Sequence, residues 1–351
     1  MSKDSSASVI LPQVHSSVSD TNPIMDENAQ FRTLKYVSLI TLTGQNALLG
    51  LSMRYGRTRS GDMFFESTAV LMAEIVKMMT CLWLVFNGEG NRSYSEWKKC
   101  LWNTIIVNYR DTLKVCIPSC VYLIQNTLLY VAAENLDVAT YQITYQLKIF
   151  TTAIFAYFIL KKVLIKSQWL SLVLLIIGVA TVQLSDAKEN QQAHTEQNRI
   201  KGFLAATTAT VLSGFAGIYF EKILKGSDVT VWMRNLQLSM LSIPLGLLTS
   251  YWRHSEDIDS KGFFHGYDFF VWYLVVLNAT GGLLVAVVVK YADNILKGFA
   301  CSLAIIISSI ASIFLFGFQI SFPFVIGAAL VISSIFMYGY VPPKDSSTRI
   351  A

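Results

Sequence analysis

The stretch "QNTLLYVAAENLDVATYQITYQLKIFTTAIFAYFIL", residues 125–160, decides the fold of this chain. It consists of two apolar runs separated by the polar "ENLD". The second run has about the 20 residues that an α-helix needs to cross a bilayer core, and the first is the end of a run of similar length that begins near residue 112. Its centre, "TYQITYQLK" (Thr140–Lys148), nevertheless carries tyrosines, threonines, glutamines and a lysine. The stretch therefore predicts two membrane-spanning helices with polar groups facing an internal space.

Composition extends this interpretation to most of the 351-residue chain. It is 53% hydrophobic and 15% charged, with a mean hydropathy of +0.46, whereas soluble domains are about 25% charged. We therefore expect an all-α polytopic membrane protein. The apolar runs predict ten transmembrane helices, at residues 34–54, 67–87, 112–134, 137–160, 168–184, 201–223, 231–251, 268–290, 293–317 and 321–340. Residues 94–107 are expected to form an amphipathic interfacial segment.

The ten expected helices fall into two groups of five, which would have opposite orientations in the membrane. Such an arrangement is typical of transporters built from inverted repeats. An alignment of the halves pairs Asp137 with Asp293 and Leu147 with Leu303, although apolar helices align easily. We expect a disordered cytosolic tail (1–33), a first repeat (34–184), a lumenal linker (185–200), a second repeat (201–340) and a cytosolic C-terminal tail (341–351).

Basic residues indicate the orientation, because lysine and arginine are enriched in cytoplasmic loops. They cluster on the side of both termini. The clusters are Arg92, Lys98, Lys99, Arg110, Lys161, Lys162 and Lys166. Both termini are therefore expected in the cytosol. The modest net charge of +5 and its location in short loops favour contact with anionic lipid and give no indication of nucleic-acid binding.

A polar stripe on the helix of residues 137–160 is the first candidate site. Tyr141, Thr144, Tyr145 and Lys148 have the i, i+3, i+4, i+7 spacing of one helix face. A nucleobase could stack on a tyrosine, and a phosphate could pair with the lysine. Alternatively, the tyrosines form an interfacial belt and the lysine snorkels. Lys148 lies near the middle of its span, which favours a functional role.

The sequence "KYADNILKGF", residues 290–299, is the second candidate. Lys297 could bind a phosphate together with Lys148, so that each half contributes one lysine. The structural alternatives are an i, i+4 ion pair between Asp293 and Lys297, or a helix-end pair between Lys290 and Asp293. The sequence favours neither the phosphate-binding role nor the structural ion pairs.

Glu74 and Lys77 are a third pair of charges inside a span. They can neutralise each other at i, i+3 spacing, yet two apolar residues would insert more favourably. A gating or coupling role is therefore expected.

Amides and glycines inside spans are further candidates. Gln125 and Asn126 could bind base edges or sugar hydroxyls, or hydrogen-bond neighbouring helices. Gly281 and Gly282 indicate close helix packing or space for a ligand. Arg234, at the start of the seventh span beside Asn235, is expected to face lipid headgroups.

Enzyme chemistry has little support. The histidines lie in expected tails and loops, and no Cys/His cluster has metal-ligand spacing. Motifs of P-loops, dinucleotide folds and nucleophile elbows do not occur. We expect no catalytic residues, cofactor or metal.

Four segments resemble one family: "QNTLLYVAAENLDVATYQITYQLKI", "SGFAGIYFEKILK", "VWMRNLQL" and "KYADNILKGFA". They resemble the nucleotide-sugar transporters of the Golgi, within the drug/metabolite transporter superfamily. The branch is that of the UDP-N-acetylglucosamine, UDP-galactose and CMP-sialic acid transporters. The resemblance covers residues 34–340. It implies ten helices in two inverted repeats and a central cavity that exchanges a cytosolic nucleotide sugar for lumenal nucleoside monophosphate.

The resemblance also implies roles for individual positions. Tyr141, Lys148 and Lys297 match family positions that contact nucleotide and phosphate, and Gln125, Asn126 and Asn235 match cavity positions. The third span has threonine after "QN", where relatives often have a second asparagine. The candidate substrate-binding residues are thus Tyr141, Tyr145, Lys148, Lys297, Gln125, Asn126, Asn235, Asn294, Gly281 and Gly282, and the gating candidates are Glu74, Lys77 and Asp293.

The expected function is import of a UDP-sugar into the Golgi lumen in exchange for UMP. UDP-N-acetylglucosamine and UDP-galactose are the foremost substrates, with UDP-N-acetylgalactosamine as a further one. The alternatives are export of another small metabolite and transport of CMP-sialic acid. Expected partners are UDP-sugar, UMP and membrane lipid, with a homodimer or a complex with Golgi glycosyltransferases as further options.

Overall fold

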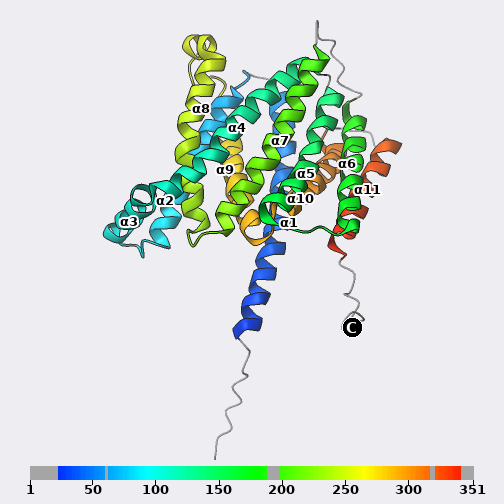
Figure 1. The fold of residues 1–351 in the computed structure, drawn as a ribbon. Helices are drawn as coiled ribbons and strands as arrows, with labels where there is room; N and C mark the ends of the chain where they lie inside the picture. Colours follow the sequence, from blue (N-terminus) through cyan, green and yellow to red (C-terminus); the bar gives the residue numbers. More distant parts are fainter. Residues whose placement is uncertain (1–22, 60–61, 137, 188–197, 317–320, 341–351) are drawn as a thin grey trace, which may run out of the picture.

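The fold is a bundle of helices (Figure 1). The computed structural model describes residues 23–59, 62–136, 138–187, 198–316 and 321–340, and within these ranges there is no strand. The helices are α1 (Pro23–Thr58), α2 (Glu66–Asn87), α3 (Tyr94–Leu101), the π-helix η1 (Trp102–Val107), α4 (Tyr109–Asn135), α5 (Val138–Leu160), α6 (Lys166–Ala187), α7 (Arg199–Lys225), α8 (Val231–Lys261), α9 (Phe269–Tyr291), α10 (Asn294–Phe316) and α11 (Phe322–Gly339). The all-helical fold class is confirmed.

Six of the described helices are long and apolar enough to cross a membrane: α2, α4, α7, α9, α10 and α11. Shorter apolar stretches lie in α5 and α6. Each of the ten expected spans coincides with one long helix, and α1 and α8 carry the remaining two. A multi-pass membrane protein follows from these lengths and compositions.

Two helices are longer than their apolar runs predict. α1 begins at Pro23, so residues 23–33, which the sequence placed in the polar tail, are helical. Proline is common at the first position of a helix, because an N–H there would have no helical partner. α8 continues beyond residue 251 to Lys261, whose ammonium group lies 2.9 Å from Asp257. Residues 1–22, 188–197 and 341–351 of the expected tails and linker lie outside the described residues.

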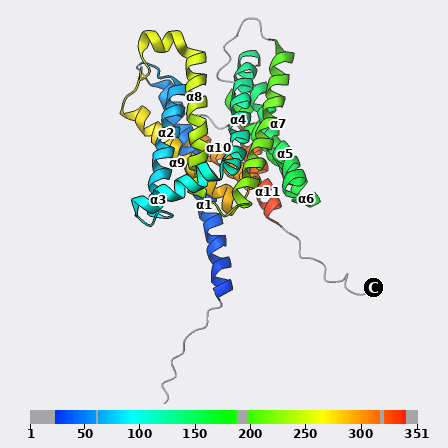
Figure 2. The same cartoon turned by 60° about the vertical axis from the view of Figure 1, so that its left-hand side comes forward.

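The expected interfacial segment consists of α3 and η1, which protrude from one side of the bundle (Figure 2). Trp102, Ile106 and Val107 are exposed there. The Thr112 hydroxyl donates to the carbonyls of Thr104 and Ile105, at 3.3 and 3.2 Å, and so satisfies backbone groups that the wider π-helical turn leaves without a helical partner.

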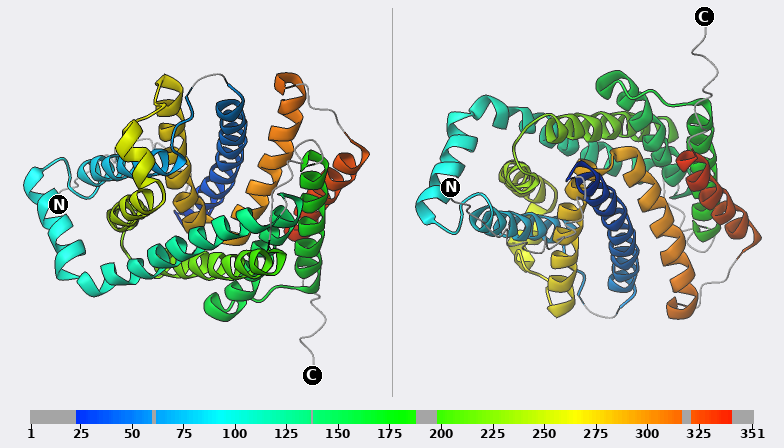
Figure 3. Two further views of the ribbon diagram at one scale, coloured as in Figure 1. Left: turned by 90° about the horizontal axis from the view of Figure 1, so that it is seen from above. Right: turned by 90° about the horizontal axis from the view of Figure 1, so that it is seen from below.

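The bundle has two triplets of helices. α4 and α5 pack against α7, and α9 and α10 pack against α1. Two further pairs, α2 with α8 and α6 with α11, lie at opposite ends of the elongated outline seen from above and below (Figure 3). At the crossing of α6 and α11, a Cβ on Gly178 would lie 2.9 Å from the Gly327 carbonyl, so these two helices approach closely because both residues are glycine.

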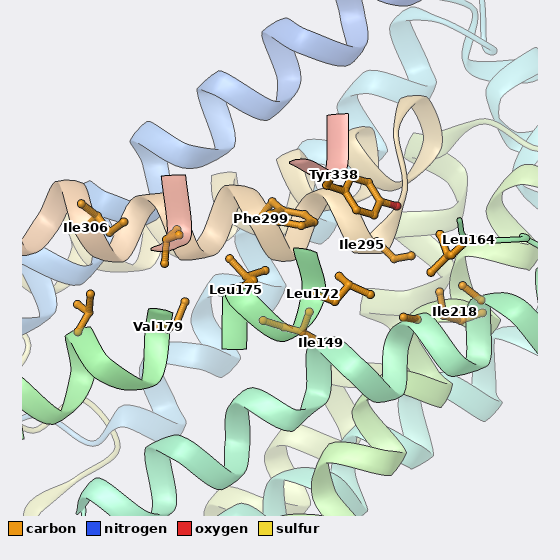
Figure 4. Close-up of a cluster of buried hydrophobic side chains, with 14 of the residues drawn as sticks. Ile149, Leu164, Leu172, Leu175, Val179, Ile218, Ile295, Phe299, Ile306 and Tyr338 are labelled. Atoms are coloured by element: carbon orange, nitrogen blue, oxygen red, sulfur yellow. The ribbon is translucent and has the colours of Figure 1, made fainter. Parts of the chain in front are cut away.

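The largest apolar core joins α5, α6, α10 and α11, with Ile218 from α7 (Figure 4). Leu172 and Leu175 are fully buried in it, and the rings of Phe299 and Tyr338 lie 4.8 Å apart. This core fixes the positions of α5 and α10, the helices that carry Lys148 and Lys297.

The bundle has a lower and an upper end. The lower end is where α1 begins and where α5, α7 and α9 end; the upper end is where α2 begins and α8 ends (Figure 1).

Candidate functional site

A cavity of about 760 Å³ lies among α2, α4, α8 and α9, with Phe220 of α7 at its wall. Its lining reaches the upper end at Glu66, the first residue of α2, and extends toward the lower end as far as Asn235, in the second turn of α8. Its volume falls within the range of about 300–1,000 Å³ that is usual for small-molecule sites. The cavity therefore penetrates most of the bundle from the upper end.

Five of the residues that the sequence singled out line this cavity: Glu74, Lys77, Asn126, Asn235 and Gly282. Further polar and aromatic side chains line it that the sequence analysis did not select, among them Ser119, Tyr122, Ser242, Thr249 and Trp252. Single hydroxyl and aromatic groups are common in membrane helices, so no local pattern separated them from packing residues.

A smaller cavity of about 280 Å³ lies among α1, α2 and α9. It has three carboxamides in its lining, Gln45, Asn46 and Asn278, and the two glycines Gly281 and Gly282. Glu74 and Lys77 belong to the linings of both cavities. This ion pair is consequently part of the wall between the two spaces.

The Glu74–Lys77 pair is well neutralised. The Lys77 ammonium group lies 2.7 Å from one carboxylate oxygen of Glu74, and the other oxygen accepts a hydrogen bond of 3.1 Å from Ser239 of α8. The side chain of Lys77 is only 7% exposed. A Cβ on Gly282 would lie 3.2 Å from the Lys77 side chain, so this glycine leaves space for the lysine.

Three residues of the polar stripe expected on α5 are in contact with one another. The rings of Tyr141 and Tyr145 are nearly parallel, with centroids 6.1 Å apart, and the Lys148 ammonium group lies 3.9 Å from the Tyr145 centroid. The stripe lies outside the linings of both cavities, but it is adjacent to the large one. Tyr141 packs near Val131, which lines that cavity.

Lys297 lies in the first turn of α10, close to the stripe. The charges of Lys148 and Glu221 act on it, which places the two lysines within electrostatic reach of each other. Within the part of the chain that the structure describes, no carboxylate forms an ion pair with Lys148 or Lys297. Like charges in an interior of low dielectric repel strongly, so an anion between them would be stabilising.

Asp293 has a different partner from those that the sequence offered. It pairs with Lys162, 131 positions earlier in the chain, at 2.5 Å, and also accepts the backbone N–H of Leu296. The alternatives of an Asp293–Lys297 or a Lys290–Asp293 pair are therefore wrong for this structure. Lys290 instead donates to the carbonyl of Leu224, because the end of α7 lies beside it.

Asn294 is buried in a polar contact between α7 and α10. Its side-chain amide donates to the carbonyl of Gly217 at 2.7 Å and to Glu221 at 3.0 Å, and its backbone N–H donates to Glu221 at 2.9 Å. Glu221 also pairs with Lys225 at 2.7 Å. We call these contacts, with the Lys162–Asp293 pair and the Lys290–Leu224 bond, the lower-end network.

Arg234 corrects another expectation. It is fully buried and does not face lipid headgroups. Its guanidinium group lies 2.6 Å from Asp111 and donates to Gln237 and Ser227, both at 2.9 Å. Arg234 thus joins the start of α8 to the start of α4, a contact between distant segments that local sequence does not reveal.

Gln125 and Gly281 also lie apart from the large cavity. Gln125 is 5% exposed, and its Oε1 atom has no hydrogen-bond partner among the described residues. A Cβ on Gly281 would lie 2.5 Å from the Gln45 amide. Gly281 therefore provides the space in which Gln45 sits.

At the upper end, Arg59 forms an ion pair with Asp268, the N-terminal cap of α9. The hydrogen bond from Arg59 lowers the pKa of the Asp268 carboxyl group, and the N–H of Val271 acts in the same direction. The contact joins the end of α1 to the start of α9.

Comparisons with known proteins agree on one family. The family model described as nucleotide-sugar transporter matches residues 30–339. The human UDP-galactose translocator is 49% identical over 324 residues, covering 92% of this chain and 81% of the relative. The human UDP-N-acetylglucosamine transporter is 48% identical, covering 91% and 99%.

Two further matches extend the comparison. A UDP-galactose/UDP-N-acetylglucosamine transporter of Caenorhabditis elegans is 48% identical over 307 residues, covering 87% of this chain and 82% of the relative. One solved crystal structure is 11% identical, with a TM-score of 0.61 over 88% of this chain and 98% of that one. At that identity, the likeness concerns the fold alone.

Proposed function

This chain belongs to the nucleotide-sugar transporter family, a family of transporters and not of enzymes, and on that premise we propose that it exchanges a UDP-sugar for UMP across the Golgi membrane. UDP-galactose and UDP-N-acetylglucosamine are the foremost substrates. They are the ligands in the names of the relatives that share about half of its residues.

The observation that carries this proposal is the pair Lys148 and Lys297. The lysines come from different halves of the chain, lie within reach of each other's charge and have no carboxylate partner among the described residues. A UDP-sugar carries two negative charges, and UMP carries roughly −1.5 to −2 at neutral pH. Two lysines neutralise either ligand, so the exchange would move little net charge across the membrane.

The nucleoside would bind between the stripe on α5 and the large cavity. Tyr141 and Tyr145 offer aromatic faces for uracil. Asn126 and Asn235 in the lining offer amide donors and acceptors for base edges or ribose hydroxyls. Val131 lines this cavity and packs against the same apolar cluster as Tyr141, which connects the stripe with the cavity.

We further propose that ten helices form two inverted five-helix repeats, residues 34–184 and 201–340. In such a protein, exchanging the halves should map the main packed pairs of helices onto packed pairs. The most extensive contacts support the proposal in this way, whereas the smaller contacts α7–α9 and α8–α9 have no counterpart of similar extent. The α4–α7 pair corresponds to α9–α1, α5–α7 corresponds to α10–α1, and α2–α9 corresponds to α8–α4, while α2–α8 and α6–α11 map onto themselves.

Alternating access fits this arrangement. The large cavity reaches the upper end, while the lower-end network joins the triplet of α4, α5 and α7 to that of α1, α9 and α10. With both termini cytosolic, the upper end faces the lumen, and this is the state that would release sugar nucleotide and take up UMP.

Purified protein reconstituted in liposomes tests the proposal. Liposomes preloaded with UMP, with CMP or without nucleotide would receive external UDP-galactose, UDP-N-acetylglucosamine or CMP-sialic acid. We expect uptake of a UDP-sugar that requires internal UMP. Uptake of CMP-sialic acid driven by CMP would contradict the assignment to UDP-sugars, and folded protein inactive under every preload would contradict nucleotide-sugar exchange.

A further inference from the structure

The smaller cavity among α1, α2 and α9 is lined by polar groups that form few hydrogen bonds with the rest of the protein. Gln45 is more than nine-tenths buried. Its amide nitrogen donates to the Leu277 carbonyl at 2.9 Å, but its Oε1 atom has no partner among the described residues. A buried acceptor without a partner costs roughly 1–3 kcal/mol, so its retention calls for an explanation.

Two more amides line the same space. Asn46 makes only a weak contact of 3.5 Å with the sulfur of Cys301, and Asn278 makes no hydrogen bond with another described residue. Amides used to join helices are normally satisfied by the neighbouring helix. Three carboxamides with spare donors and acceptors around one cavity instead match a ligand rich in hydroxyl or acetamido groups.

The size and position of the cavity indicate which part of the ligand it takes. At about 280 Å³ it lies just below the range of roughly 300–1,000 Å³ for sites that hold whole small molecules. It shares five lining residues with the large cavity: Val70, Glu74, Lys77, Gly282 and Val285. The two cavities are therefore neighbours, with the Glu74–Lys77 pair in the wall between them, so that the two ends of one ligand could occupy them.

The smaller cavity is also near the lysine pair. Asn46 lies against Cys301, which is one helical turn above Lys297 on α10. A diphosphate held at Lys297 would thus place its two substituents on different sides, the nucleoside toward the large cavity and the sugar toward α1 and α9.

We propose that Gln45, Asn46 and Asn278 form a hexose subsite, which binds the hydroxyl or acetamido groups of the pyranose in a UDP-sugar. This inference rests on the proposed function. Gly281 supports the subsite from behind, because any side chain there would displace the Gln45 amide. UMP has no sugar beyond its ribose and does not use this subsite.

The contrast between UDP-sugar and UMP supplies the test. In proteoliposomes, the KM for UDP-galactose and UDP-N-acetylglucosamine is measured beside UMP-for-UMP exchange, for wild type, Gln45→Leu and Asn278→Ala. Loss of one or two hydrogen bonds should raise the KM for at least one UDP-sugar roughly tenfold. UMP exchange should stay within about twofold, since those bonds are not made to UMP.

Asn87→Leu is the matched control, because it removes a carboxamide from the exposed end of α2, outside both cavities. It should leave both exchange reactions unchanged. Thermal stabilisation by UMP checks that each variant is folded. Asn278→Ala keeps the test valid should Gln45→Leu fail to fold, because Asn278 is only half buried.

Two results would overturn the subsite: equal losses for UMP and both UDP-sugars, which would indicate a structural role, or an unchanged KM for both UDP-sugars in both folded variants. Wild-type protein without any UDP-sugar uptake would contradict the proposed function itself. A failure confined to the variants concerns the subsite alone.

Discussion

Two regions of this bundle hold lysines in the membrane interior in different ways. Lys77 on α2 is held 2.7 Å from Glu74, within one helix, and the pair is part of the wall between two cavities. Lys148 and Lys297 come from different halves and face each other's charge without a carboxylate partner among the described residues. A lysine at mid-membrane costs at least roughly 2.5–3.5 kcal/mol, which an ion pair offsets for Lys77, whereas Lys148 and Lys297 form no ion pair with a described carboxylate.

This difference distinguishes Lys77, which has a structural role, from Lys148 and Lys297, which are available to bind a ligand. A neutralised pair needs no ligand and can remain intact through a transport cycle. Two cations without a carboxylate partner are most stable with an anion bound. For transport, that anion must also be able to dissociate. Lysine suits this use, because its flexible ammonium group does not hold phosphate in the fixed two-point geometry of arginine.

The largest expected effect is at the unneutralised pair. Lys148→Ala or Lys297→Ala should reduce UDP-sugar/UMP exchange by at least roughly 30-fold, because removing one buried charge partner costs about 2–5 kcal/mol. Uptake into preloaded liposomes measures it. Lys99→Ala, which removes an exposed lysine 3.1 Å from Glu96 on α3, is the control and should be fully active. Normal transport by either alanine variant would contradict the phosphate role.

The neutralised pair should respond through stability. Lys77→Met leaves the Glu74 carboxylate without its cation and should lower the free energy of unfolding by about 1–3 kcal/mol, a value reduced because Glu74 is partly exposed. The double variant Glu74→Gln/Lys77→Met should recover most of the loss. Thermal unfolding in detergent measures both, and strictly additive losses would show that the two residues do not act as a pair.

A smaller effect is expected at the aromatic stripe. Tyr141→Ala removes one ring of the Tyr141–Tyr145 stack and should weaken UMP and UDP-sugar by the same factor, roughly 2- to 10-fold, since both ligands contain uracil. Competition binding to purified protein compares the two. Selective weakening of the UDP-sugar would assign Tyr141 to the sugar.

The smallest effect is expected at the lower-end network. Lys162→Ala removes the partner of Asp293, a partly exposed pair worth at most about 1 kcal/mol. The state open at the lower end should become up to about fivefold more populated, which would lower the KM for UDP-sugar offered from that side. Sealed membrane vesicles with the lower end outward measure it. A higher KM would contradict the inference that the Lys162–Asp293 pair stabilises the state closed at the lower end.

Sequence predicted the all-helical fold class and the apolar helices, because helix formation in a membrane depends on local apolar length. The stripe of Tyr141, Tyr145 and Lys148 was also predictable, since its contacts lie within one helix. The extension of α1 from Pro23 was not, because residues 23–33 are too polar to be recognised as part of an apolar run.

Contacts between distant segments escaped prediction. The Lys162 partner of Asp293 and the Asp111 partner of Arg234 come from other helices, and no spacing rule identifies them. Gln45 and Asn278 were missed although a signal existed. Each is an amide inside an apolar run, the same feature that drew attention to Gln125 and Asn126.

Direct binding of UMP and of uridine, which lacks phosphate, tests the central claim. In wild-type protein, calorimetry should show much tighter binding of UMP than of uridine. In Lys148→Ala and Lys297→Ala, UMP affinity should fall toward that of uridine, while uridine affinity stays unchanged. If the difference between UMP and uridine persists in both variants, these lysines do not bind the phosphate and the account is contradicted.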